Sequence, residues 1–164
     1  MELYQRPFKT LFIDTIGPFN PESDGCRYIF HAECPFSRYC WLKASASDTE
    51  EAWAKFLMEE VFLDVCGFPV FLRSDRGSAF TSKLVEEMNR LLQITHRFGS
   101  AYHPQAQGYI EARHKPVQSI LRAYVASVPE NWAKCVKFAQ WALRCVPRED
   151  GMGRSPYEIV TFPV

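Results

Sequence analysis

The sequence has no excess of charge of either sign: 19 basic residues balance 19 acidic residues, for a net charge of +0. Proteins that bind nucleic acids through phosphate contacts usually carry a basic excess. A nucleic-acid role would therefore depend on local placement of charge or on partner domains. Hydrophobic residues make up 47% and charged residues 23% of the 164 residues, which argues against disorder and predicts one globular domain over residues 1–164.

Long apolar runs and a signal peptide are also lacking. No hydrophobic stretch approaches the ~18 residues that a membrane span requires. A glycine-rich phosphate loop and a Ser-His-Asp motif are absent from the sequence as well. These absences disfavour membrane proteins, P-loop nucleotide hydrolases and triad hydrolases.

The six cysteines form no Cys-x-x-Cys pair. Their even number allows disulfides, but a chain of this size does not need them, and we expect reduced, mostly buried thiols in an intracellular protein. His31-x-x-Cys34, with Cys26 and Cys40 nearby, hints at zinc. Alternating strand residues point to opposite faces and would scatter these ligands, so we favour packing roles, including for Cys66, Cys135 and Cys145.

The first third of the chain predicts three strands joined by short turns, which is typical of an antiparallel meander. The pattern then alternates between helical and strand periods. Strands are expected at 8–16, 27–33, 38–44, 69–74 and 94–98, and helices at 47–67, 83–92, 108–128 and 130–146. This order predicts an α/β fold in which a five-stranded mixed sheet, three antiparallel strands and then two parallel ones, carries helices on both faces.

Three carboxylates occupy conspicuous places in this order. Asp14 lies inside an apolar strand, Asp75 closes another, and Glu111 follows a loop at the start of a long helix. Each alone has an ordinary explanation as a cap, a turn former or a solvated residue. Together they suit one chemistry, because two hard cations about 4 Å apart need several carboxylate oxygens and can stabilise both oxygens of an in-line phosphoryl transfer.

The residues around these acids carry a family resemblance. The motifs are Ile-Asp14-Thr-Ile-Gly-Pro, Ser-Asp75-Arg-Gly-Ser-Ala-Phe and 102–111 (YHPQAQGYIE), with 35 residues between Asp75 and Glu111. They resemble the integrase catalytic core of retroviruses and long-terminal-repeat retrotransposons, closest to the Ty3/gypsy type. The ending 153–160 (GRSPYEIV) is also similar, and the resemblance spans about residues 6–164.

The resemblance implies an RNase H-like fold and a polynucleotidyl transferase. Asp14, Asp75 and Glu111 would be the catalytic residues and would hold two Mg²⁺ (or Mn²⁺) ions. The site would trim a 3′ DNA end and then join that end to target DNA. It also implies the nucleus as location, and a longer protein whose zinc-binding and carboxy-terminal DNA-binding domains lie outside this chain, so that the core alone should bind DNA weakly. We further expect the two aspartates to be preformed and Glu111 to be displaced without metal and DNA.

Two residues depart from the family pattern. His114 stands where Asn is frequent, and Pro116 lies inside the predicted helix, where it should remove a hydrogen bond and kink the helix. With the neutral charge, these departures motivate an alternative function: a catalytically silent, host-adopted or decayed core that serves as a nucleic-acid-binding or dimerisation module. A third alternative, a related RNase H-like nuclease, usually has four carboxylates.

Residues near the third carboxylate are candidates for DNA contact. Tyr102, His103 and Gln105 lie in the preceding loop, where the alternative is an ordinary proline turn. Lys115 and Gln118 follow Glu111 on one helical face if Pro116 does not rotate it, with Arg122 further along. A solvated face with a weak Glu–Lys pair is the alternative.

Aromatic residues near the last predicted helix suggest a homodimer. Trp132, Phe138 and Trp141 exceed what a thin helix needs for its own packing. Relatives of this core use helices to dimerise, so these residues are candidates for a homodimer or higher-oligomer interface, with core packing as the alternative.

Overall fold

A five-stranded mixed sheet forms the centre of the protein, which we describe from a computed structural model. The structure describes residues 6–64, 67–99, 115–123, 131–147 and 153–162. The strands are β1 (Thr10–Ile16), β2 (Tyr28–Glu33), β3 (Cys40–Ser45), β4 (Phe71–Ser74) and β5 (Thr95–Phe98). They lie in the order β3-β2-β1-β4-β5, with β1–β2 and β2–β3 antiparallel and β1–β4 and β4–β5 parallel. The predicted sheet is confirmed.

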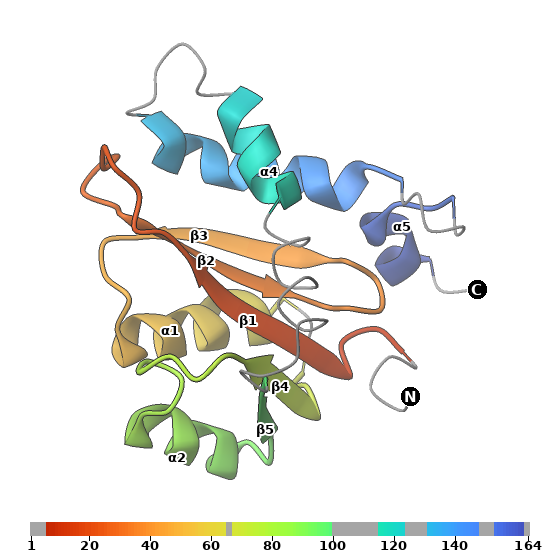
Figure 1. Cartoon of the computed structure of the whole chain (residues 1–164). Helices are drawn as coiled ribbons and strands as arrows, with labels where there is room; N and C mark the ends of the chain where they lie inside the picture. The colour runs from red at the N-terminus through yellow and green to blue at the C-terminus, as the bar shows by residue number, and fades with distance from the viewer. Residues whose placement is uncertain (1–5, 65–66, 100–114, 124–130, 148–152, 163–164) are drawn as a thin grey trace.

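Helices cover both faces of this sheet, as predicted (Figure 1). On one face lie α1 (Glu50–Phe56), its continuation as a π-helical segment η2 (Leu57–Phe62), and α2 (Lys83–Leu91). On the other lie a helical stretch over 115–123, α4 (Trp132–Cys145) and α5 (Pro156–Thr161). In the described part of the chain no helix is long and apolar enough to cross a membrane.

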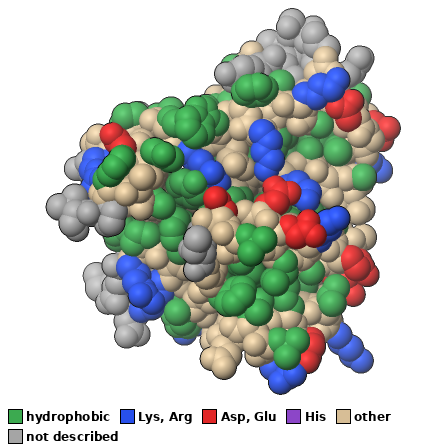
Figure 2. Space-filling view, turned by 180° about the vertical axis from the view of Figure 1, so that it is seen from behind, with side chains coloured by type: hydrophobic (Ala, Val, Ile, Leu, Met, Phe, Trp, Pro, Cys, Tyr) green, Lys and Arg blue, Asp and Glu red, His purple; other side chains and the backbone are tan. Residues whose placement is uncertain are grey.

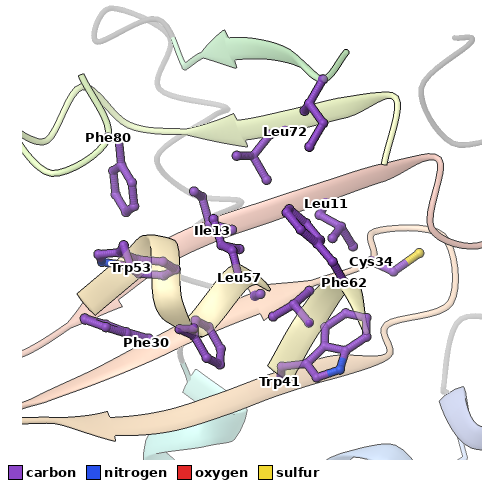
Figure 3. Packing of buried hydrophobic residues seen from close by; sticks show 14 of the residues in the cluster. Leu11, Ile13, Phe30, Cys34, Trp41, Trp53, Leu57, Phe62, Leu72 and Phe80 are labelled. Carbon is purple, nitrogen blue, oxygen red and sulfur yellow. The ribbon is translucent and has the colours of Figure 1, made fainter. Parts of the chain in front are cut away.

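The main core lies between the sheet and α1–η2 (Figure 3). Trp53, Phe56 and Leu57 are fully buried, as their helical spacing predicted. The ring of Trp53 stacks on Phe30 of β2 with centroids 4.3 Å apart. Each such side chain contributes on the order of 1.5–3 kcal/mol by burial, so this layer holds the sheet in the shape that positions its strand ends.

A second core lies between the sheet and the helices of the other face. Ile16, Ile29 and Leu42 of the sheet meet Val117 and Leu121 of the 115–123 stretch, all at most 4% exposed. The chain thus places this stretch across β1, β2 and β3. The start of the described stretch, at Lys115, therefore belongs to the same face of the sheet.

Two features of the helices differ from what the sequence predicts. Leu84 and Leu91 share the helical spacing of Val85 and Met88, which predicts one packed side, but they are 41% and 66% exposed, because α2 packs mainly through Val85. The helix α5 was not expected at all, although Ser155 and Glu158 form a capping box there, with Pro156 at the first turn. That pattern is a recognised helix-start signal.

Candidate active site

The candidate site begins near the carboxyl end of β1, where Asp14 lies two residues before the last strand residue, Ile16. Its carboxylate Oδ1 accepts a hydrogen bond from the backbone N–H of Thr15 at 2.8 Å. On the opposite face Thr15 Oγ1 donates to Asp48 Oδ1 at 2.9 Å, and Trp53 Nε1 donates to the same oxygen at 3.0 Å. The end of β1 is therefore fastened to the start of α1, which limits the movement of Asp14.

Asp75 follows the last residue of β4 and is exposed. Its Oδ1 accepts a hydrogen bond from the backbone N–H of Gly77 at 2.8 Å, the arrangement of an Asx turn. A Cβ added at Gly77 would lie 3.1 Å from that oxygen and 3.4 Å from Phe80 Cδ2. Gly77 thus allows the turn to close tightly against the carboxylate. Sequence reasoning did not single out Gly77, although Asp-x-Gly after a strand is a turn signal.

The two aspartates occupy matched positions on neighbouring parallel strands. Phe12 pairs with Arg73 in the β1–β4 register, and each aspartate lies two residues beyond its member of that pair. Residues two apart on a strand share a face. Asp14 therefore shares the face of Phe12 and Ile16, which is the face covered by the 115–123 stretch and α4. The structure brings these two predicted residues to one sheet edge.

The third predicted carboxylate, Glu111, lies outside the described residues, as do Tyr102, His103, Gln105 and His114. Within the described ranges no cluster of three or more His, Cys, Asp or Glu side chains forms a metal site. The expected displacement of Glu111 stays a prediction.

The other predicted contact residues lie in the described helix. Lys115 is exposed and Gln118 is half-buried, while Val117 and Leu121 face the core. Gln118 also lines a hollow of about 320 Å³ with Arg122, Phe19 and Trp132, among others. Pro116 lies near the start of the described stretch, so any kink toward Glu111 lies outside the description.

The hinted zinc ligands do not form a cluster within the described ranges. His31 is buried opposite Asp14 in the β1–β2 register, and its Nε2 lies 3.4 Å from Glu33 Oε2. Cys34 and Cys40 are buried, Cys26 is intermediate, and no disulfide joins the five described cysteines to one another. Cys135 is intermediate and Cys145 is exposed, so the prediction of mostly buried thiols holds only for Cys34 and Cys40 among the described cysteines. Cys66 lies outside the described residues.

The three aromatic residues proposed for a dimer interface separate into two groups. Trp132 is 4% exposed and packs at a tilt against Phe19 with ring centroids 4.7 Å apart, so it is a core residue. Phe138 and Trp141 are 64% and 59% exposed on α4. Seen from behind, apolar side chains reach the surface in several patches, including the upper half of the molecule (Figure 2).

Comparison with known proteins finds similar sequences among retroelement polyproteins. No protein-family model matches it. It is 29% identical over 138 residues to a Pro-Pol polyprotein of feline foamy virus, which covers 84% of the chain and 12% of the polyprotein. It is 23% identical over 161 residues to a retrovirus-related Pol polyprotein from transposon 412 of Drosophila melanogaster, covering 97% of the chain and 13% of that protein. The chain thus spans about an eighth of the length of these relatives.

Solved structures share the fold. The catalytic core domain of BIV integrase matches with a TM-score of 0.71 at 24% identity, over 93% of each chain. The HTLV-2 integrase catalytic core domain in complex with magnesium, in its dimeric form, matches with a TM-score of 0.74 at 17% identity, over 97% of this chain and 99% of that one. A simian T-cell lymphotropic virus intasome contains a chain that matches with a TM-score of 0.82 at 16% identity. The match covers 96% of this chain and 56% of that one.

Proposed function

Starting from an integrase core domain with the RNase H-like fold, we propose that this chain is the catalytic part of a polynucleotidyl transferase that trims the 3′ ends of element DNA and joins them to host DNA. The observation that carries the proposal is the matched placement of Asp14 and Asp75, each two residues beyond the Phe12–Arg73 pair of the parallel strands β1 and β4. An ordinary turn former would not require a second carboxylate at the equivalent position of the neighbouring strand.

The donor set fits hard divalent cations. Carboxylate oxygens are the ligands that Mg²⁺ and Mn²⁺ prefer. Asp14 and Asp75 each have Oδ1 oriented by a backbone N–H at 2.8 Å, and such outer contacts fix the direction of metal ligands. We propose that these residues and Glu111 hold two ions, which when bound supply positive charge for the attacking and leaving oxygens.

The chain itself contributes placement and orientation. The N–H of Gly77 and the Thr15–Asp48–Trp53 contacts keep the two strand ends in fixed positions. Holding reactants in line accounts for several kcal/mol of a typical barrier. No covalent bond between protein and DNA is required.

DNA is the proposed partner. Lys115 and Gln118 lie off the buried side of their helix, on the sheet face that Asp14 shares. They are suited to contact phosphates beside the carboxylates, together with Tyr102, His103 and Gln105 from the preceding loop. Because the chain has a net charge of +0, we expect weak DNA binding by this core alone. We propose the nucleus as the location, as the family resemblance implies.

A homo-oligomer is the second proposed partner relation. The HTLV-2 core domains were solved in dimeric and trimeric forms. Here Phe138 and Trp141 present aromatic surface on α4, and Trp141 lies 6.0 Å from the ring of Tyr157 of α5. Exposed aromatic surface of this kind is typical of protein interfaces. Trp141→Lys should raise the monomer fraction in sedimentation velocity, whereas Leu63→Lys, at another exposed apolar residue, serves as the matched surface control.

The test of the catalytic proposal is strand transfer and its reversal on branched DNA, with Mg²⁺ or Mn²⁺. Asp75→Asn should abolish both while the unfolding midpoint stays close to wild type, because Asp75 is exposed and makes its turn through one oxygen. Asp24→Asn, at another exposed loop aspartate, is the control and should keep activity. Full activity of the Asp75→Asn protein would overturn the assignment.

The neutral charge favours one other candidate, a catalytically silent core that binds nucleic acid or forms dimers. It predicts no divalent-metal binding that depends on Asp14. Calorimetry with Mn²⁺ separates the two: binding lost in Asp14→Asn supports the transferase, and wild-type protein without binding supports the silent module.

A further inference from the structure

A row of hydrogen-bonded side chains runs from α2 through β5 to the end of β4, directly behind Asp75. Asn89 Nδ2 lies 3.3 Å from His96 Nδ1, and His96 Nε2 lies 2.9 Å from Ser74 Oγ. Ser74 Oγ in turn donates to the backbone carbonyl of Asp75 at 2.7 Å. Three elements that are separate in the sequence therefore end on one peptide group, the one that follows Asp75.

The direction of each hydrogen bond in this row follows from the atoms. The single hydroxyl hydrogen of Ser74 goes to the Asp75 carbonyl, so Ser74 Oγ must accept from His96 Nε2. The neutral ring then accepts at Nδ1, where the Asn89 amide donates. Burial lowers the pKa of His96 to about 4, which keeps this neutral form at physiological pH.

The row is more than core packing. Asn89 is only 4% exposed, and its Oδ1 has no hydrogen-bond partner in the described part of the chain. Such a buried acceptor costs about 1–3 kcal/mol. An apolar residue at this position would avoid that cost. What only the amide supplies is a hydrogen-bond donor for His96 Nδ1, and this contact accounts for an asparagine at a buried position.

The row contacts the Asp75 backbone from the sheet face of the main core, whereas the Asp75 carboxylate belongs to the opposite face. Leu72 pairs with His96 and belongs to the main core, so Ser74 and His96 share that face. The carbonyl of Ser74 accepts from Gly99 N–H at 2.8 Å, and the Asp75 carboxylate accepts from Gly77 N–H at 2.8 Å. The peptide group before Asp75, the peptide group after it and its carboxylate therefore each accept a hydrogen bond that fixes their orientation.

We propose that Asn89, His96 and Ser74 are positioning residues that set the metal affinity of Asp75 by fixing the orientation of its backbone. The inference rests on the proposed function, since it takes Asp75 as a metal ligand. In this proposal the row acts through the backbone carbonyl of Asp75, the group that Ser74 Oγ contacts, and its members are not themselves metal ligands. A carboxylate with a free backbone would have to be oriented at each binding event, which weakens binding.

Mn²⁺ binding to the whole chain, followed by electron paramagnetic resonance, tests the proposal without DNA or turnover. His96→Leu and Ser74→Ala each break the row and should weaken Mn²⁺ binding by about tenfold, the lower end of outer-contact effects. His96→Gln keeps an amide donor for Ser74 and should stay within about twofold of wild type. Val136→Ala, in the second core, is the control for a general loss of stability. It should leave Mn²⁺ affinity unchanged.

The outcomes of this experiment distinguish the positioning role of the row from the proposed function of Asp75 as a metal ligand. Mn²⁺ affinity of His96→Leu and Ser74→Ala equal to wild type overturns the positioning role and leaves the proposed function intact. Equal weakening in His96→Gln and His96→Leu also overturns it, because rescue by the donor would have failed. Wild-type Mn²⁺ binding that survives Asp75→Asn overturns the proposed function and the positioning role together.

Discussion

Replacing Gly77 by alanine should weaken the candidate site while leaving the fold intact. The added Cβ would lie 3.1 Å from Asp75 Oδ1 and 3.4 Å from Phe80 Cδ2. The contact with the Asp75 oxygen is tighter than ordinary van der Waals contact, and the contact with Phe80 leaves no room on its other side. Phe80 is 4% exposed and packs against Trp53 with centroids 4.9 Å apart, so it cannot withdraw easily. The exposed carboxylate must move instead.

The size of the effect follows from the geometry. A shift of a few tenths of an ångström lengthens the 2.8 Å hydrogen bond from Gly77 N–H to Asp75 Oδ1 and changes the orientation of the carboxylate. Loss of such an outer contact costs about tenfold in metal affinity, which corresponds to about 1.4 kcal/mol. Gly77 does not have a positive φ, so alanine should change the free energy of unfolding by less than about 1 kcal/mol.

The assay pairs Mn²⁺ titration with urea unfolding, and Gly67→Ala is the control. A Cβ at Gly67 meets nothing within 4 Å, and its φ is not positive. Gly67→Ala should leave both Mn²⁺ affinity and stability near wild type. If Gly77→Ala binds Mn²⁺ as tightly as Gly67→Ala does, the Asx turn does not orient Asp75 and the reasoning is refuted.

Three further predictions concern stability. Because burial lowers the pKa of His96 to about 4, below the ~6.5 of an unfolded chain, the unfolded chain gains a proton first as pH falls. The free energy of unfolding should therefore drop between pH 7 and 5 by about 1 kcal/mol after allowance for partial exposure of the ring, and urea curves of His96→Gln should lack this slope; an equal slope would contradict it. Arg144→Met should cost about 2–3 kcal/mol in urea unfolding, because it removes a buried donor to Cys40 O at 2.8 Å and a cation over the Tyr39 ring at 3.9 Å; a loss under 0.5 kcal/mol would refute this. Ser155→Ala should lower stability by about 1 kcal/mol through loss of the α5 cap, and Ser155→Asp should recover most of it in thermal melts; no difference between the two would count against the cap.

The sheet was predictable from the sequence because local signals and topology agree. Apolar runs of four to eight residues bounded by turns marked the strands, and the change to helical period after residue 46 marked the crossover to β4. Trp53, Phe56 and Leu57 were identifiable as core because they recur on one helical face. The short helix α5 was missed because six residues carry almost no periodicity, although its capping box was readable.

The candidate site was predictable in its residues and less so in its supports. Asp14 and Asp75 stood out because carboxylates at apolar strand ends are costly unless they have a partner or a ligand. The Asn89–His96–Ser74 row could not be foreseen, because its members lie on three elements and meet only through the β4–β5 register and the packing of α2. The exposure of Leu84 and Leu91 was equally hidden, since periodicity shows a face but not what covers it.

Anomalous scattering from a crystal of the whole chain soaked in Mn²⁺ would show whether Asp14 and Asp75 hold a metal ion together. We expect a manganese peak bound by carboxylate oxygens of both Asp14 and Asp75, with a second peak once Glu111 and DNA are in place. The peak should vanish in Asp75→Asn crystals. Saturating Mn²⁺ with no peak between the two aspartates, or a peak that persists in Asp75→Asn, would contradict the account.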